Sequence, residues 1–128
     1  METKRVLVVD DDVDLCDSLK AVLERAGYVA QTAHGRSEGM ETIRATRPDL
    51  VVLDVMMGTW HDGFDMSREL KGDPELKATP ILMLTSVESK TAVEFKSSVG
   101  DPTWLPVDRF LDKPVEEEVL LAEIEKLL

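Results

Sequence analysis

Short apolar runs alternate with longer amphipathic segments along the whole chain. The short runs are rich in branched aliphatic residues, which is typical of buried strands. They predict strands at Arg5–Val9, Val29–Ala33, Leu50–Leu53, Pro80–Leu84 and Arg109–Leu111. In the longer segments apolar residues recur at helical spacing, which predicts helices over Val13–Ala26, Arg36–Thr46, Phe64–Leu70, Glu88–Ser98 and Glu116–Leu128.

The regular alternation of strand and helix predicts the fold class. Repeated βα units favour right-handed crossovers and a parallel sheet with helices on both faces. We therefore expect an α/β protein with a single doubly wound (βα)5 domain over residues 1–128. In such sheets, ligands bind beyond the carboxyl ends of the strands. We therefore expect the functional residues at that edge of the sheet.

Composition narrows the setting and the partners. A net charge of −11, with scattered Lys and Arg, argues against direct binding of nucleic acid. The chain shows neither an apolar run long enough for a membrane span nor room for a targeting segment before the first strand. The single cysteine, Cys16, cannot form an internal disulfide, so we expect a reducing, cytoplasmic location. Cys16 lies on a predicted helix beside Leu15 and Leu19, which indicates core packing.

Acidic residues follow two of the predicted strands. The first strand leads into Asp10, Asp11 and Asp12, and the third leads into Asp54. Burying an unpaired charge is costly, so carboxylates at the ends of buried strands indicate a nucleophile, a metal ligand or a deeply paired anion. Asp12 is also the expected N-cap of the helix that follows. The pattern predicts one shared acidic pocket.

Two further polar residues follow predicted strands and complete the expected chemistry. Neighbouring carboxylates repel one another, and a hard divalent cation such as Mg²⁺ removes that conflict. Lys113 could pair with Asp54 or with a phosphoryl oxygen, and Thr85 could donate a hydrogen bond to another. These groups together indicate in-line phosphoryl transfer onto the Asp54 carboxylate.

At these positions the chain resembles the receiver domain of two-component response regulators over essentially its whole length. The motifs that carry the resemblance are Val8–Asp11, Val52–Met57, Leu82–Ser86 and Phe110–Pro114. The resemblance implies the flavodoxin-like strand order 2-1-3-4-5. It also implies a signalling switch that accepts a phosphoryl group from a sensor histidine kinase or a phosphotransfer protein. Such a domain catalyses only its own phosphorylation and dephosphorylation.

The same resemblance implies roles for particular residues. Asp54 would be the phosphoacceptor, and Mg²⁺ or Mn²⁺ would be held by Asp10, Asp11, Asp54 and the main-chain carbonyl of Met56. Asp11 would be the principal ligand, and Asp10 would act directly or through water. The groups that read the phosphoryl group would be Thr85, Lys113 and the aromatic switch residue Phe110.

The chain departs from the family pattern in two places. Gly58 stands where the family usually has Pro, and the loop to Asp62 is one residue longer than usual. The segment from Lys96 to Val107 is also several residues longer, and it carries Trp104. Trp104 is interpreted either as part of a partner surface or as a local lid packed on its own domain.

Other functions fit fewer of these residues. A degenerate receiver that binds partners without phosphorylation would not need the complete acidic and phosphoryl-reading set. A phosphatase of the haloacid-dehalogenase type would use Asp10 as its nucleophile and would leave Asp54 unexplained. The cognate kinase, the downstream target and homodimer formation stay open.

Overall fold

A computed structural model describes residues 3–54, 62–86, 109–113 and 116–128. For residues 62–64, 85, 86, 109, 110, 112 and 113 it describes the backbone alone. The predicted helix Glu88–Ser98, the carbonyl of Met56 and the side chain of Trp104 lie outside the described residues, so these predictions stand as they were made.

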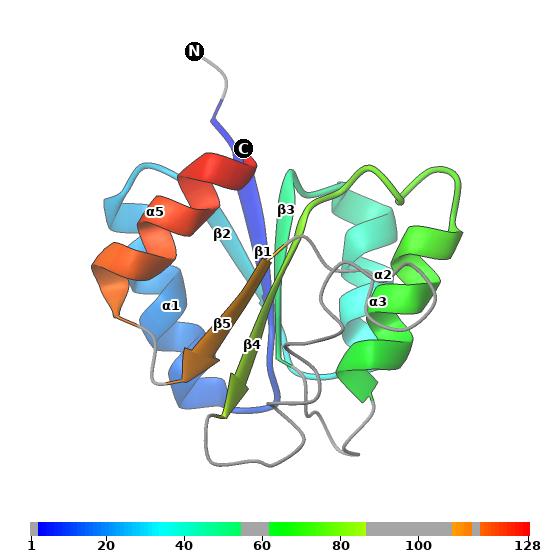
Figure 1. The fold of residues 1–128 in the computed structure, drawn as a ribbon, viewed down its shortest axis with the longest axis horizontal. Helices are drawn as coiled ribbons and strands as arrows, with labels where there is room; N and C mark the ends of the chain where they lie inside the picture. The colour runs from blue at the N-terminus through cyan, green and yellow to red at the C-terminus, as the bar shows by residue number, and fades with distance from the viewer. Residues whose placement is uncertain (1–2, 55–61, 87–108, 114–115) are drawn as a thin grey trace.

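The strands form one parallel sheet (Figure 1). They are β1 (Arg5–Val9), β2 (Val29–Ala33), β3 (Leu50–Asp54), β4 (Ile81–Ser86) and β5 (Arg109–Lys113). Their order across the sheet is β2-β1-β3-β4-β5, and each neighbouring pair runs parallel. The predicted fold class and strand order are therefore confirmed.

Helices cover both faces of this sheet. The described helices are α1 (Val13–Arg25), α2 (Arg36–Thr46), α3 (Asp62–Gly72) and α5 (Glu117–Leu127). Figure 1 shows α1 and α5 on one face and α2 and α3 on the other. Within the described ranges, no helix combines the length and the apolar character needed to cross a membrane.

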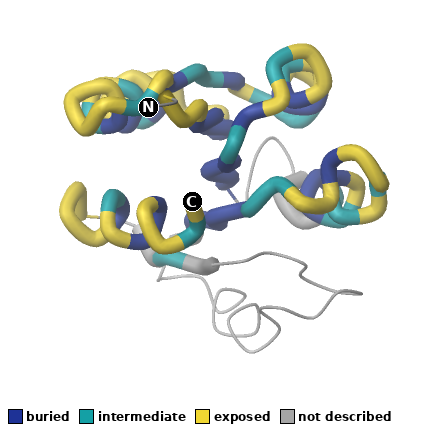
Figure 2. Tube along the Cα trace, turned by 90° about the horizontal axis from the view of Figure 1, so that it is seen from above, coloured by how far each residue is buried: buried dark blue, intermediate teal, exposed yellow. Residues whose placement is uncertain are grey.

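Side-chain alternation along the strands divides the interior into two cores. On β1, Leu7 and Val9 pack toward α2 and α3, whereas Val6 and Val8 pack toward α1 and α5. Strands buried on both faces have no polar side, which is why they appear in the sequence as continuous apolar runs. Figure 2 shows the buried residues along the strands and the exposed residues on the outward faces of the helices. Cys16 is fully buried in the core on the α1 side, as predicted.

Several element boundaries differ from the prediction. β4 and β5 continue past their last apolar residues, because the ladder still pairs Thr85 with Asp112 and Ser86 with Lys113. Thr85 and Lys113 therefore lie within strand ends rather than after them. Helix α3 begins at Asp62, two residues before the predicted start at Phe64. An acidic residue is favourable in the first turn of a helix, so the Asp-Gly pair here starts a helix instead of a turn.

Helix α1 is bounded by the residues that the sequence indicates. The Asp12 carboxylate accepts a hydrogen bond from the backbone N–H of Leu15 at 3.1 Å, as an N-cap does. At the other end, Gly27 has a φ of +98°, a conformation that side-chain-bearing residues rarely adopt. The start of α1 is thus fixed directly after the acidic residues of β1.

Exposed ion pairs join α2 to α3. The Glu69 carboxylate of α3 lies 3.2 Å from Arg36 and 3.4 Å from Arg44, both on α2. These side chains are each more than one-third exposed, so the pairs contribute at most a modest free energy. Packing beneath them holds the two helices more firmly.

Gly39 is the point of closest approach between α2 and the rest of this core. A Cβ atom placed there would lie 2.8 Å from Met66 Cε on α3 and 3.0 Å from Val9 Cγ1 on β1. The Met66 terminus can move aside at little cost, but Val9 is β-branched and held in a buried strand. Gly39 therefore sets how near α2 lies to the sheet.

We predict that Gly39→Val lowers the free energy of unfolding by about 2 kcal/mol, because overpacking a filled site forces neighbours out of their rotamers. Gly72→Ala is the matched control, since no atom lies within 4 Å of a Cβ there. This control should be neutral or slightly stabilising. Urea unfolding measures both changes. Equal stability of Gly39→Val and the wild type would show that α2 can shift freely.

Candidate metal centre

The register of β1 and β3 brings two acidic strand ends side by side. Val9 of β1 pairs with Leu53 of β3, so Asp10 and Asp54 each come one residue after a matched pair. Parallel strands end at the same edge of the sheet, which places both carboxylates where ligands of doubly wound folds bind. The position of Asp54 therefore follows from strand pairing.

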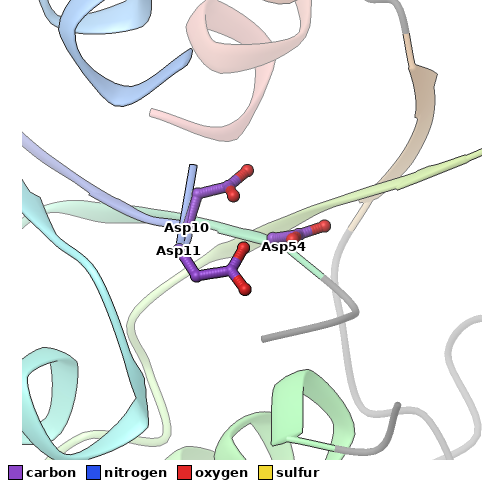
Figure 3. A group of neighbouring side chains, drawn as sticks. All are labelled: Asp10, Asp11 and Asp54. Carbon is purple, nitrogen blue, oxygen red and sulfur yellow. The ribbon is translucent and has the colours of Figure 1, made fainter. Parts of the chain in front are cut away.

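Three carboxylates form one cluster at this edge. Asp10, Asp11 and Asp54 each offer an oxygen atom, and these atoms all lie within 4.8 Å of one another. Figure 3 shows the side chains of Asp10 and Asp11 beside that of Asp54, from the ends of two adjacent strands. Asp10 is only 2% exposed and Asp54 only 6% exposed, whereas Asp11 is open to solvent. The cluster thus has a buried floor and an accessible side.

Hydrogen bonds hold Asp10 through its N–H, its carboxylate and its carbonyl. Its N–H donates to the carbonyl of Ala33 at 3.0 Å, just past the end of the β1–β2 ladder. Its Oδ1 accepts from the backbone N–H of Asp12 at 2.9 Å, and its carbonyl accepts from the Cys16 thiol at 3.3 Å. The sequence predicted Asp12 as an acid of the pocket and as a helix cap, and Cys16 as core packing. Their contacts with Asp10 are additional.

The Cys16 thiol is strongly disfavoured from ionising. Burial raises the pKa of Cys16 from 9.0 to about 12, and the negative charge of Asp10 acts in the same direction. The hydrogen bond with the Asp10 backbone acts the other way but is outweighed. Cys16 therefore remains a protonated hydrogen-bond donor at neutral pH, and its thiol is a poor nucleophile.

The remaining predicted residues are placed by their backbone or lie outside the description. Asp54 pairs with Leu84, so Thr85 of β4 follows directly beside the acidic cluster. Lys113, the last residue of β5, pairs with Ser86 at the same edge. Phe110 pairs with Met83, further back along β5. The backbone thus gathers Asp54, Thr85 and Lys113 on three adjacent strands.

The donor set of the cluster suits a hard divalent cation. Carboxylate oxygen is the ligand type that Mg²⁺, Mn²⁺ and Ca²⁺ prefer. Two buried carboxylates and a third, exposed one repel each other, and a cation between them would offset that repulsion. Asp10, Asp11 and Asp54 therefore fit a magnesium site. The solvent-facing side at Asp11 leaves room for water or for an oxygen of a substrate.

The raised pKa of Cys16 predicts a loss of stability in alkali. In the unfolded chain the thiol ionises near 9.0, and in the folded protein only near 12. The contribution of the protonated thiol to the free energy of unfolding is complete below pH 9.0 and is lost as the pH rises toward 12. In this window the free energy of unfolding should fall more steeply for the wild type than for Cys16→Ala. The difference in slope should be at most about 1.4 kcal/mol per pH unit.

Urea unfolding of both proteins at pH values below and above 9.0 measures this difference. All other ionisable groups are common to both proteins, so their contributions cancel in the comparison. Parallel pH dependences would show that the thiol is not shielded as its burial indicates.

Comparisons with known proteins identify relatives of the chain. The sequence matches the response regulator receiver domain family over residues 6–125. It is 38% identical over 124 residues to the response regulator MprA of Mycobacterium tuberculosis, covering 97% of this chain and 50% of MprA. The chain therefore spans about half the length of the curated relatives it matches.

Solved structures share the fold. The receiver domain of a signal transduction histidine kinase from Syntrophus aciditrophicus superposes with a TM-score of 0.85 at 31% identity, covering 98% of this chain and 90% of that one. The chemotaxis response regulator CheY4 of Vibrio cholerae gives a TM-score of 0.83 at 29% identity, covering 99% and 100%. Together with the family match, these similarities show that the chain belongs to the response regulator receiver domain family.

Proposed function

We propose that this receiver domain accepts a phosphoryl group on Asp54 in a reaction that requires Mg²⁺. The observation that carries the proposal is the cluster of Asp10, Asp11 and Asp54, with oxygen atoms within 4.8 Å of one another. Carboxylate oxygens gathered this closely are the donor set that a hard divalent cation prefers, and a carboxylate in reach of such a cation can act as a nucleophile toward phosphorus. Membership of a phosphorylated signalling family supports the same conclusion.

In the proposed reaction, an Asp54 carboxylate oxygen attacks the phosphorus of the donor. A new O–P bond forms, and the bond from phosphorus to the donor's histidine nitrogen breaks, with its electron pair remaining on that nitrogen. Asp10 and Asp11, with the Met56 carbonyl, are the proposed metal ligands. A divalent cation, when bound there, supplies charge neutralisation for the carboxylates and for the phosphoryl oxygens.

Thr85 and Lys113 are the proposed readers of the phosphoryl group. The strand register supports this assignment, because both residues end strands at the edge where Asp54 lies. The Thr85 hydroxyl would donate a hydrogen bond to one phosphoryl oxygen, and the Lys113 ammonium would pair with another. Phe110, on the same strand as Lys113, would then repack and change the distal face.

The proposed partners follow from this chemistry. The donor would be a sensor histidine kinase or a phosphotransfer protein working in the cytoplasm. The phosphorylated form would favour a downstream target through its distal face, where Trp104 is a proposed contact. MprA is about twice as long as this chain, so an effector region joined to the receiver is a further proposal.

We predict that acetyl phosphate with Mg²⁺ phosphorylates the wild type and leaves Asp54→Asn at background, since the amide is not a nucleophile. Chelation of Mg²⁺ should abolish the modification, and Asp11→Asn should slow it strongly. Intact-mass spectrometry measures the labelled fraction. Asp17→Asn, which removes an exposed acid of α1 outside the cluster, is the matched control and should behave as the wild type.

The competing functions give different results in the same assay. A degenerate receiver would show no label on the wild type under conditions that phosphorylate an ordinary receiver. A haloacid-dehalogenase-type phosphatase would retain label on Asp54→Asn and lose it on Asp10→Asn. Either result would contradict the proposal.

A further inference from the structure

The contact between Cys16 and Asp10 ties the acidic cluster to the core on the α1 side. The Cys16 thiol is fully buried and donates to the Asp10 carbonyl at 3.3 Å. We propose that Cys16 is a positioning residue that sets the relative orientation of the Asp10 and Asp11 carboxylates for binding a small divalent cation. This inference rests on the proposed function, because it assigns a residue to the same metal site.

A single peptide group joins the two acids. The Asp10 carbonyl belongs to the planar peptide group between Asp10 and Asp11. The direction of that carbonyl relative to the Asp10 side chain is set by ψ of Asp10, so a contact to the carbonyl restrains one of the dihedral angles that relate the two side chains. The thiol thus acts on the hinge between the buried acid and the exposed one.

Two further hydrogen bonds hold Asp10 at other atoms than its carbonyl. The Asp10 N–H, on the N-terminal side of its Cα atom, donates to the Ala33 carbonyl. The Asp10 Oδ1 accepts from the Asp12 N–H. Neither contact is made to the Asp10 carbonyl. Cys16 itself is held in place, because its N–H donates to the Asp12 carbonyl at 3.0 Å in the first turn of α1. The thiol therefore approaches the carbonyl from a rigid helix.

The identity of the cation gives this role a specific consequence. Mg²⁺ demands near-ideal octahedral geometry, whereas Ca²⁺ tolerates irregular coordination. A loosened Asp10–Asp11 peptide should therefore weaken Mg²⁺ binding more than Ca²⁺ binding. A residue that only filled the core would affect stability without changing the preference between the two ions.

The test compares Cys16→Ala, Cys16→Ser and Ile124→Val with the wild type. Cys16→Ala removes the donor, and Cys16→Ser keeps one. Ile124→Val is the matched control, because it trims a fully buried side chain of the same core from α5. Backbone amide NMR shifts, titrated with Mg²⁺ and separately with Ca²⁺, give each dissociation constant without any phosphorylation. Urea unfolding reports the stability of each variant.

We expect Cys16→Ala to weaken Mg²⁺ binding about tenfold, the lower end of the effect typical of groups that orient metal ligands. Its Ca²⁺ affinity should change less than about threefold, because Ca²⁺ accepts varied geometry. Cys16→Ser and Ile124→Val should bind Mg²⁺ as the wild type does, whatever their stability.

Four outcomes would overturn the inference. Unchanged Mg²⁺ affinity in Cys16→Ala would remove the positioning role while leaving the proposed function intact. Equal losses for Mg²⁺ and Ca²⁺, or an equal loss in Ile124→Val, would assign the effect to general destabilisation. A wild type that does not bind Mg²⁺ would overturn both the inference and the proposed function.

Discussion

The pairing of β1 with β3 is the constraint on which the rest of the site depends. Because Val9 lies opposite Leu53, the next residue on each strand is an acid, and the two acids are adjacent and buried. Slipping one strand by one residue would turn its side chains into the opposite core, where the packing partners differ. The apolar interior therefore enforces the approach of two like charges that would otherwise separate. Fold stability and the chemistry of the cluster have the same origin.

The acidic cluster is also connected by hydrogen bonds to the start of helix α1. Asp12 starts α1 and at the same time holds the Asp10 carboxylate through its N–H. One turn along, Cys16 contacts the Asp10 carbonyl from within the core. The acids consequently lie at the meeting point of a strand end, a helix start and a packed interior. Such surroundings preorganise ligands, which lowers the cost of ordering them when a cation binds.

Strand–helix alternation predicts the fold class, because each apolar run here is a strand buried on both faces. The order of the strands does not follow from this alternation, because no local pattern indicates that β3 lies beside β1. Only the resemblance to a family predicts the order. The apolar runs predict ends for β4 and β5 that are too early, because Thr85 and Lys113 are polar but still pair in the ladder. The contact of Cys16 with Asp10 was not predicted, because a thiol that bonds six residues back along the chain leaves no periodic signal.

The hydrogen bond from the Asp10 N–H to the Ala33 carbonyl links the acidic cluster to the edge of the sheet. Ala33 ends β2, which is the edge strand of the sheet and exposes Val29. Edge strands present unpaired backbone groups that can pair with strands of other molecules, and detachment of β2 would expose a further edge on β1. A ligand that binds only the ordered acidic cluster favours by mass action the state in which β2 stays attached. Occupation of the site would thus also protect the molecule from self-association through its sheet edge.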